Sequence, residues 1–237
     1  MKIILENIGK RFNKEWIFRN VSYEFSFGNS ASGGSLPTGQ AGTSGGKYSI
    51  LGTNGSGKST LLQIIAGAMS QTEGEIKSEV RSQKSEVNSQ QQEFLFKNIS
   101  YAAPYLELPE EMTWKEAVRF HGKFKKFAPS LKGEDIIFLS GLESSVNKEI
   151  RNFSSGMKQR ARLALAILSD TPLLLLDEPA TNLDESAVKW YQNLISEFTK
   201  EKLVIVCSNY NKEEYSFCDK ELVLPPPLAR VYFNACN

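Results

Sequence analysis

Hydrophobic residues recur along the chain in two different patterns. Val21, Tyr23 and Phe25 alternate with polar residues, which predicts a half-buried antiparallel strand within a run of strands over the first 25 residues. Three later stretches have the length of a strand and are apolar without alternation: KYSIL (47–51), LLLL (173–176) and LVIVC (203–207). Such runs suit strands that are buried on both faces of a parallel sheet.

Residues with helical spacing lie between these strands. Helices are predicted after the turn that follows Leu51, after Gly156 and over 187–198. A longer stretch, 106–142, looks mostly helical and carries prolines as turn signals. Because apolar strands alternate with helices, the sequence predicts an α/β fold with a parallel sheet.

Three segments fall outside this alternation. Residues 28–46 are rich in glycine and serine, and we expect a flexible insertion between two strands. The stretch KSEVRSQ at 77–83 is followed at once by KSEVNSQ at 84–90, a duplication too short for an architectural unit that predicts a hairpin or loop extension. Residues 225–237 begin with three prolines and are expected to form a tail.

A phosphate-binding motif lies between the first apolar run and the helix after it. The stretch GTNGSGKS (52–59) matches G-x-x-x-x-G-K-[ST] in the strand–turn–helix setting that the motif requires. Its glycines let successive backbone N–H groups curl around a polyphosphate, Lys58 would neutralise the β- and γ-phosphates, and the Ser59 hydroxyl would bind Mg²⁺. The residues that we expect to contact the nucleotide here are Gly52, Asn54, Gly55, Ser56, Gly57, Lys58, Ser59 and Thr60.

A second candidate site follows the run of four leucines. Asp177 and Glu178 come at the carboxyl end of this predicted parallel strand, where side chains enter a nucleotide crevice. Asp177 would hold Mg²⁺ and Glu178 would polarise an attacking water. Many strands end in an acid, so these two gain their significance from the phosphate loop upstream.

With these motifs together, the chain resembles the nucleotide-binding domain of ABC transporters from Met1 to about Leu224. The resemblance assigns Gly52–Ser59 to the Walker A loop, Leu173–Glu178 to Walker B and Pro179–Asp184 to the D-loop. It implies a P-loop NTPase with a parallel-sheet core, an N-terminal antiparallel β subdomain and a helical subdomain. The implied single domain divides into a nucleotide-binding core (1–98 and 160–224) and a helical and signature subdomain (99–159).

The resemblance also explains NFSSGMKQR (152–160), which falls where the family has its LSGGQ signature. In the family, two domains dimerise head to tail and each signature covers the ATP on the partner's Walker A loop. Ser154 would donate its hydroxyl, and the N–H groups of Ser155 and Gly156 open a helix that favours an anion. Asp184 of the D-loop completes the implied nucleotide contacts. The implied partners are a second ABC ATPase chain, identical or different, and a separate transmembrane permease.

An aromatic residue that stacks on adenine is expected near the N-terminus. Phe12 falls at that position of the family pattern, and stacking requires only a flat ring. Trp16 is an alternative, and either ring could instead be part of the core.

The chain departs from the family pattern at three places. The signature reads FSSGM, so Ser155 replaces a glycine and Met157 a glutamine. The segment ISYAAPYLEL contains no glutamine at the Q-loop position, near Ala103–Tyr105. Asn209 occupies the position of the switch histidine, and asparagine can donate a hydrogen bond but cannot titrate. We therefore predict an ATPase with catalytic residues Lys58, Glu178 and Asn209 whose ATP binding is intact and whose turnover is slow.

The composition narrows the remaining possibilities. The chain has 28 Lys and Arg against 27 Asp and Glu, a net charge of +1, which argues against a nucleic-acid partner. We find no apolar run long enough for a signal peptide or a membrane span, and the three cysteines are scattered, so we expect a reduced cytoplasmic protein on the inner face of the membrane. The single histidine, His121, is interpreted as a solvated helix residue.

Three functions remain open on the sequence. The first is the ATPase subunit of a transporter whose translocation pathway belongs to another polypeptide, contacted by the helical region 104–148. The second is a nucleotide-gated binding module, the silent half of a heterodimer, which would bind ATP without turning it over alone. The third is an ABC protein that acts on ribosomes or DNA without transport, which the single domain and balanced charge argue against.

Overall fold

The structure is a computed structural model that describes residues 1–27, 46–79 and 97–226. All but the last residue of the predicted insertion at 28–46 lies outside these ranges, as do most of the duplicated stretch at 77–90 and of the tail. No helix among the described residues is long and apolar enough to cross a membrane.

The N-terminal residues form an antiparallel sheet with strand order β2-β1-β4. Its strands are β1 (Lys2–Phe12), β2 (Glu15–Ser26) and β4 (Glu73–Glu79). Within β2, Val21 and Phe25 are buried and Tyr23 is partly buried, while Ser22 and Glu24 between them are exposed, so the predicted alternation is confirmed. The predicted antiparallel β subdomain is therefore present.

A second sheet of five parallel strands forms the core, in the order β5-β6-β7-β3-β8. Its strands are β3 (Lys47–Leu51), β5 (Ile99–Ala102), β6 (Leu173–Asp177), β7 (Leu203–Ser208) and β8 (Lys220–Val223). In β6, Leu174 and Leu176 join one hydrophobic cluster and Leu173 and Leu175 join the other. Because both faces of the strand are buried, the run of leucines needs no polar alternation.

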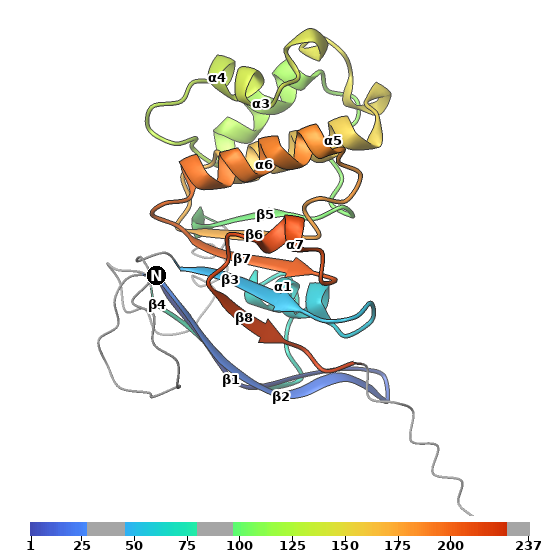
Figure 1. Ribbon diagram of the computed structural model, residues 1–237, viewed down its shortest axis with the longest axis vertical. Helices are drawn as coiled ribbons and strands as arrows, with labels where there is room; N and C mark the ends of the chain where they lie inside the picture. The colour runs from blue at the N-terminus through green and yellow to red at the C-terminus, as the bar shows by residue number, and fades with distance from the viewer. Residues whose placement is uncertain (28–45, 80–96, 227–237) are drawn as a thin grey trace, which may run out of the picture.

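Helices cover both faces of this core sheet (Figure 1). On one side, α1 (Lys58–Ile65) lies between the core sheet and the antiparallel sheet, within one hydrophobic cluster. On the other side lie α5 (Ser155–Ile167) and α6 (Glu185–Phe198), with α3 (Trp114–Phe124) and α4 (Gly133–Leu139) beyond them. Short helical turns at Glu143–Ser145, Ile150–Asn152 and α7 (Lys212–Tyr215) complete the described elements.

Local capping sets where these helices begin. Thr113 and Glu116 form a reciprocal capping box at the start of α3, and the side chain of Ser154 accepts from Met157 N at the start of α5. The stretch predicted as mostly helical is thereby divided into α3 and α4. At the predicted subdomain boundaries, β5 begins at Ile99 but pairs with β6 inside the core sheet, and α5 runs across the boundary between residues 159 and 160.

Candidate functional site

The loop between β3 and α1 is shaped by its glycines. Gly57, the residue before the helix, has φ +94°, and a Cβ there would lie 2.6 Å from Ile17 Cγ2 and 2.7 Å from Phe18 Cδ1. Only glycine fits a backbone that is both left-handed and packed this closely. Along the loop, Asn54 and Gly55 are exposed, Gly52 and Ser56 are buried, and Ser59 and Thr60 are partly buried at the start of α1.

Lys58 is folded into this loop. Its side chain is 5% exposed, and Nζ donates to Gly52 O at 2.9 Å and to Thr53 O at 3.1 Å. No side chain caps the helix that begins at Lys58, so its first N–H groups face the loop. The loop therefore combines a buried cation with the positive end of a helix, an arrangement that suits a phosphate.

Asp177, at the carboxyl end of β6, is 2% exposed. Its Oδ1 has no hydrogen-bond partner among the described residues, while the Ser59 hydroxyl also bonds the carboxylate. Burial is the main cause that raises the pKa of Asp177. A buried carboxylate oxygen with spare capacity beside a hydroxyl fits Mg²⁺, which prefers oxygen ligands. Because the described residues contain no group of three His, Cys, Asp or Glu able to hold a metal, nucleotide phosphates would have to complete the shell.

A tyrosine that the sequence analysis did not single out contacts the same carboxylate. Tyr105 donates its hydroxyl to Asp177 Oδ2 at 3.2 Å, and the same hydroxyl accepts from Gln63 Nε2 of α1 at 3.1 Å and bonds the hydroxyl of Tyr101. Tyr105 lies within the segment where the Q-loop glutamine was expected. No spacing or composition signal in the sequence marks it, because the contact depends on how the loop after β5 folds back onto β6.

Glu178 and Asn209 follow neighbouring strands. The last pair of the β6–β7 ladder joins Asp177 to Cys207. Glu178 and Asn209, which follow these two residues, therefore lie at the same edge of the sheet. Glu178 has φ +43°, in the left-handed region, and its N–H donates to Cys207 O at 3.0 Å. Asn209 is exposed directly after β7. The structure thus brings the three residues predicted for metal binding and catalysis at this edge close to one another.

The signature residues line a pocket of their own, of about 260 Å³. Ser154, Gly156 and Asp184 line it, and none of the residues predicted in the phosphate loop does. Ser154 and Ser155 are exposed at the start of α5. Asp184, predicted to contact nucleotide, also caps α6: its Oδ1 accepts from Ala187 N at 2.7 Å, and this bond holds the pKa of Asp184 below its usual value.

The two aromatic candidates for adenine stacking differ in how free their rings are. Phe12, at the end of β1, is 44% exposed, with Lys10 Nζ 4.9 Å from the ring centroid. Trp16 has the guanidinium of Arg19 over its ring at 4.2 Å and that of Arg11 at 5.3 Å. An adenine would have to displace two guanidinium groups from Trp16 but only the Lys10 ammonium from the more exposed Phe12, so the geometry favours Phe12.

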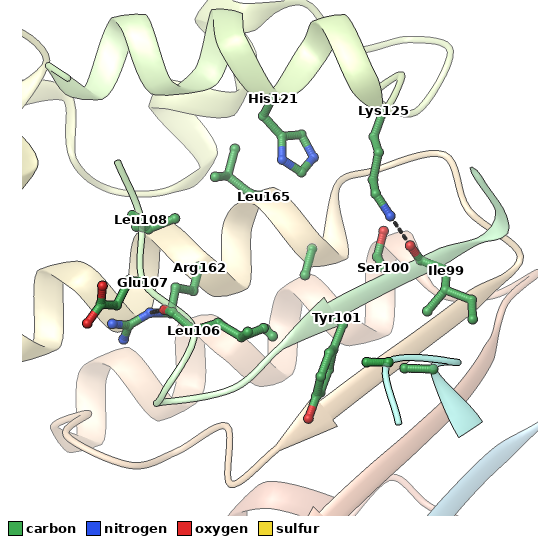
Figure 2. Close-up of a pocket in the computed structure, with 14 residues that line it drawn as sticks. Ile99, Ser100, Tyr101, Leu106, Glu107, Leu108, His121, Lys125, Arg162 and Leu165 are labelled. Atoms are coloured by element: carbon green, nitrogen blue, oxygen red, sulfur yellow. Dashed lines mark hydrogen bonds between the residues drawn. The ribbon is translucent and has the colours of Figure 1, made fainter. Parts of the chain in front are cut away.

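A larger pocket of about 490 Å³ lies between β5, α3 and α5 (Figure 2). Its wall is mostly apolar, but Lys125 donates to Ile99 O and Arg162 donates from Nε to Leu106 O at 2.5 Å. Burial is the main cause that lowers the pKa of both basic groups. Glu107 is the acidic residue of this wall.

His121 also lies in the wall of this larger pocket, so the interpretation of a solvated helix residue is wrong. Its Nε2 lies 2.8 Å from Ser169 Oγ, and its ring stacks on Phe127 with centroids 5.5 Å apart. Burial lowers the pKa of His121 to about 4, so the imidazole is neutral at pH 7.

Comparison with known proteins identifies the family. Residues 42–181, more than half of the chain, match the model of the family described as ABC transporter. The chain belongs to the ABC transporter family. The resemblance drawn from the Walker A, Walker B and signature motifs is therefore confirmed.

Relatives in this family are ATP-binding proteins. The chain is 28% identical over 214 residues to the uncharacterized ABC transporter ATP-binding protein YybJ of Bacillus subtilis, covering 90% of this chain and 88% of YybJ. It is 29% identical to the ABC transporter ATP-binding protein NatA of the same organism, covering 74% and 71%. Other curated relatives are longer: the match spans 56% of YdbJ from B. subtilis.

Solved ABC structures share the fold. The dimeric bacterial ABC transporter cassette MJ0796 aligns with a TM-score of 0.74 and 23% identity, covering 94% of both chains. A structure described as the ATP-binding subunit of an ABC transporter aligns with a TM-score of 0.75 and 20% identity. At these identities the likeness supports the fold, including the parallel-sheet core predicted for a P-loop ATPase.

Proposed function

We propose that this ABC transporter family member is the ATP-binding subunit of a transporter, which hydrolyses MgATP as a head-to-tail dimer and drives a separate permease. The observation that carries the proposal is the meeting of Lys58, Ser59 and Asp177 at one sheet edge, with a buried carboxylate oxygen left unpaired among the described residues. A signature pocket that contains no phosphate-loop residue supports the dimeric part, because each half-site then needs a second chain.

Each residue has a chemical role in this proposal. Lys58 exchanges its bonds to the loop carbonyls for the β- and γ-phosphates, and the loop N–H groups bind the remaining phosphate oxygens. Mg²⁺ bound by Ser59 and Asp177 would neutralise phosphate charge. Glu178 accepts a proton from the attacking water, and Asn209 donates an amide hydrogen bond to the γ-phosphate.

The remaining contacts hold the nucleotide from two sides. Phe12 stacks on adenine within the same chain. Ser154, Ser155 and Gly156 bind the γ-phosphate on the partner chain through hydroxyl and backbone donors. Asp184 fixes the start of α6 beside the signature and contacts the same nucleotide.

The larger pocket is where we place the permease, at the cytoplasmic face of the membrane. It lies next to Leu106–Leu108, the segment that follows Tyr105, so an occupant of the pocket would touch the loop that reaches Asp177. The wall of the pocket holds two half-buried cations, Lys125 and Arg162, at separate ends, and one acidic residue, Glu107, beside Arg162. This balance favours a short apolar segment of the permease that carries a carboxylate.

The permease contact is tested by filling the mouth of this pocket. Ala68 is exposed and lines it, so Ala68→Trp should reduce the fraction of the chain that sediments with membranes of the cells that produce it. Basal ATP hydrolysis should stay within about twofold of the unmodified chain. Asn193→Trp, on an exposed position of α6, is the matched control. Equal sedimentation of both variants would contradict this docking site.

The ATPase is tested by measuring MgATP hydrolysis by the purified chain as a function of its concentration, with Glu178→Gln as the blank. If two chains build each site, the rate per chain rises with concentration and is absent from the blank. A rate per chain that is constant over the whole range would contradict the shared site.

A second candidate is supported by Asn209 and by the tyrosine at the Q-loop position. A chain that binds ATP but shows no hydrolysis above the blank at any concentration is a nucleotide-gated module, the silent half of a heterodimer. Hydrolysis separates the two, since only one function requires turnover, and titration with a fluorescent ATP analogue verifies the ATP binding that both require.

A further inference from the structure

A buried carboxylate close to the catalytic edge has no role in the mechanism above. Glu214, in α7, is 3% exposed, and its Oε1 accepts from Ala180 N at 3.2 Å. The Ser208 hydroxyl at the end of β7 donates to Asn211 O at 3.3 Å and lies near enough to this carboxylate to act on its pKa. In residues 1–27, 46–79 and 97–226, no lysine or arginine forms an ion pair with it. Burying a carboxylate without a cation is unfavourable, so the burial of Glu214 needs an explanation.

The titratable groups around Glu214 are acids. From β6 and the loop after it come Asp177 and Glu178, from β7 comes Cys207, and from α6 comes Tyr191, whose hydroxyl donates to Glu214 O at 2.9 Å. Burial, followed by repulsion from Glu178 and Asp177, raises the pKa of Glu214 to about 7. A neutral apolar residue would avoid this cost entirely.

The backbone that Glu214 holds is strained. Glu178 adopts φ +43°, which is unfavourable for a residue with a Cβ and persists only where surrounding bonds enforce it. Two backbone bonds fix it: Glu178 N donates to Cys207 O at 3.0 Å, and Thr181 N donates to Glu178 O at 3.1 Å. The bond from Ala180 N to Glu214 lies between them along the chain and ties the same turn to α7.

We propose that Glu214 is a positioning residue for Glu178: its Oε1 holds the N–H of Ala180 and thereby keeps residue 178 in the left-handed conformation from which it acts. The inference rests on the proposed role of Glu178 as the group that accepts the proton from water.

Two conservative substitutions of Glu214 separate the effect of side-chain length from the effect of charge. Glu214→Gln keeps the length of the side chain and an oxygen acceptor but removes the charge, whereas Glu214→Asp keeps the charge and shortens the side chain by one methylene. We expect Glu214→Gln to keep kcat within about threefold and Glu214→Asp to lower kcat about 10- to 100-fold, with the KM for ATP changed less than about twofold in both. Tyr191→Phe is the control, because it removes a bond to the carbonyl of Glu214 and leaves the carboxylate in place.

Backbone hydrogen exchange over residues 178–184 supplies a readout that does not need turnover. The proposal predicts faster exchange in Glu214→Asp and unchanged exchange in Glu214→Gln and Tyr191→Phe. Full kcat in Glu214→Asp, equal loss in both Glu214 variants, or slow exchange in Glu214→Asp would each overturn it. If the unmodified chain hydrolyses no ATP above the Glu178→Gln blank, the proposed function fails, and the exchange data still decide whether Glu214 holds the turn.

Discussion

The phosphate loop and the start of α5 are both glycine-containing turns that open a helix, but they are built differently. In the loop, Lys58 is buried and bonds two loop carbonyls, and Gly57 packs against β2. At the start of α5, Ser154 and Ser155 are exposed, and the pocket beside them is lined by the D-loop. The first region keeps its cation buried within one chain, whereas the helix start of the second is open to solvent.

This difference predicts that the phosphate loop binds the nucleotide and that the start of α5 acts in the steps that need two chains. An enclosed loop with its own cation can bind a nucleotide in a single chain. An open helix start contributes little until a second surface covers it, since exposed anion contacts are weak in water. Substitutions in the loop should therefore remove binding, and substitutions at α5 should remove only the steps that need two chains.

The largest effect is expected from Lys58→Met. Loss of a buried charge that would contact phosphate costs about 2–3 kcal/mol, so the dissociation constant for ATP should rise roughly 100-fold. Titration with a fluorescent ATP analogue measures it, with the exposed Lys189→Met as the control. An unchanged dissociation constant would contradict the prediction that the phosphate loop binds ATP within one chain.

The next effect is expected from Gly156→Val. A Cβ at this position would lie 3.0 Å from Asn182 O, so a branched side chain would push the signature away from the D-loop. Hydrolysis should fall about 10- to 100-fold while the dissociation constant for ATP stays within about threefold. Measuring ATP binding and hydrolysis in parallel checks this. A loss of binding as large as that in Lys58→Met would contradict the prediction that the start of α5 acts only in the steps that need two chains.

A smaller change is expected from Asn209→His. A histidine can carry the proton and charge that asparagine lacks, so turnover should rise a few-fold near neutral pH while ATP binding is unchanged. Steady-state hydrolysis at several pH values measures the effect. An unchanged or lower rate would indicate that Asn209 does not limit turnover.

The smallest effect is expected from Tyr105→Phe. The hydroxyl is partly exposed, so its bond to Asp177 is worth about 1 kcal/mol or less, and the Mg²⁺ concentration for half-maximal hydrolysis should rise about twofold. Tyr23→Phe, in the N-terminal sheet, is the control. A rise of more than tenfold would mean that Tyr105 itself contributes to the metal site.

The parts predicted from the sequence are those encoded by consecutive residues. The apolar runs predicted β3, β6 and β7, and the motif at 52–59 predicted the loop, because strand, turn and helix follow one another along the chain. Tyr105 and Glu214 were not predicted as site residues, since each reaches β6 or the turn after it from an element distant in sequence. The capping of α6 by Asp184 was also not predicted, and the contact of Asp184 with nucleotide stays a prediction, since it depends on a second chain.

The position of β3 in the core sheet affects how the protein is made. This strand, which leads into the phosphate loop, hydrogen-bonds to β7 on one edge and to β8 on the other. Both partners are translated after it, near the opposite end of the described chain. During synthesis both edges of β3 therefore stay unpaired until these strands are made. Pairing between strands so distant in sequence is slow, and unpaired strand edges are prone to aggregation. The two strands that pair with β3 and support the phosphate loop are therefore available only when most of the described chain has left the ribosome.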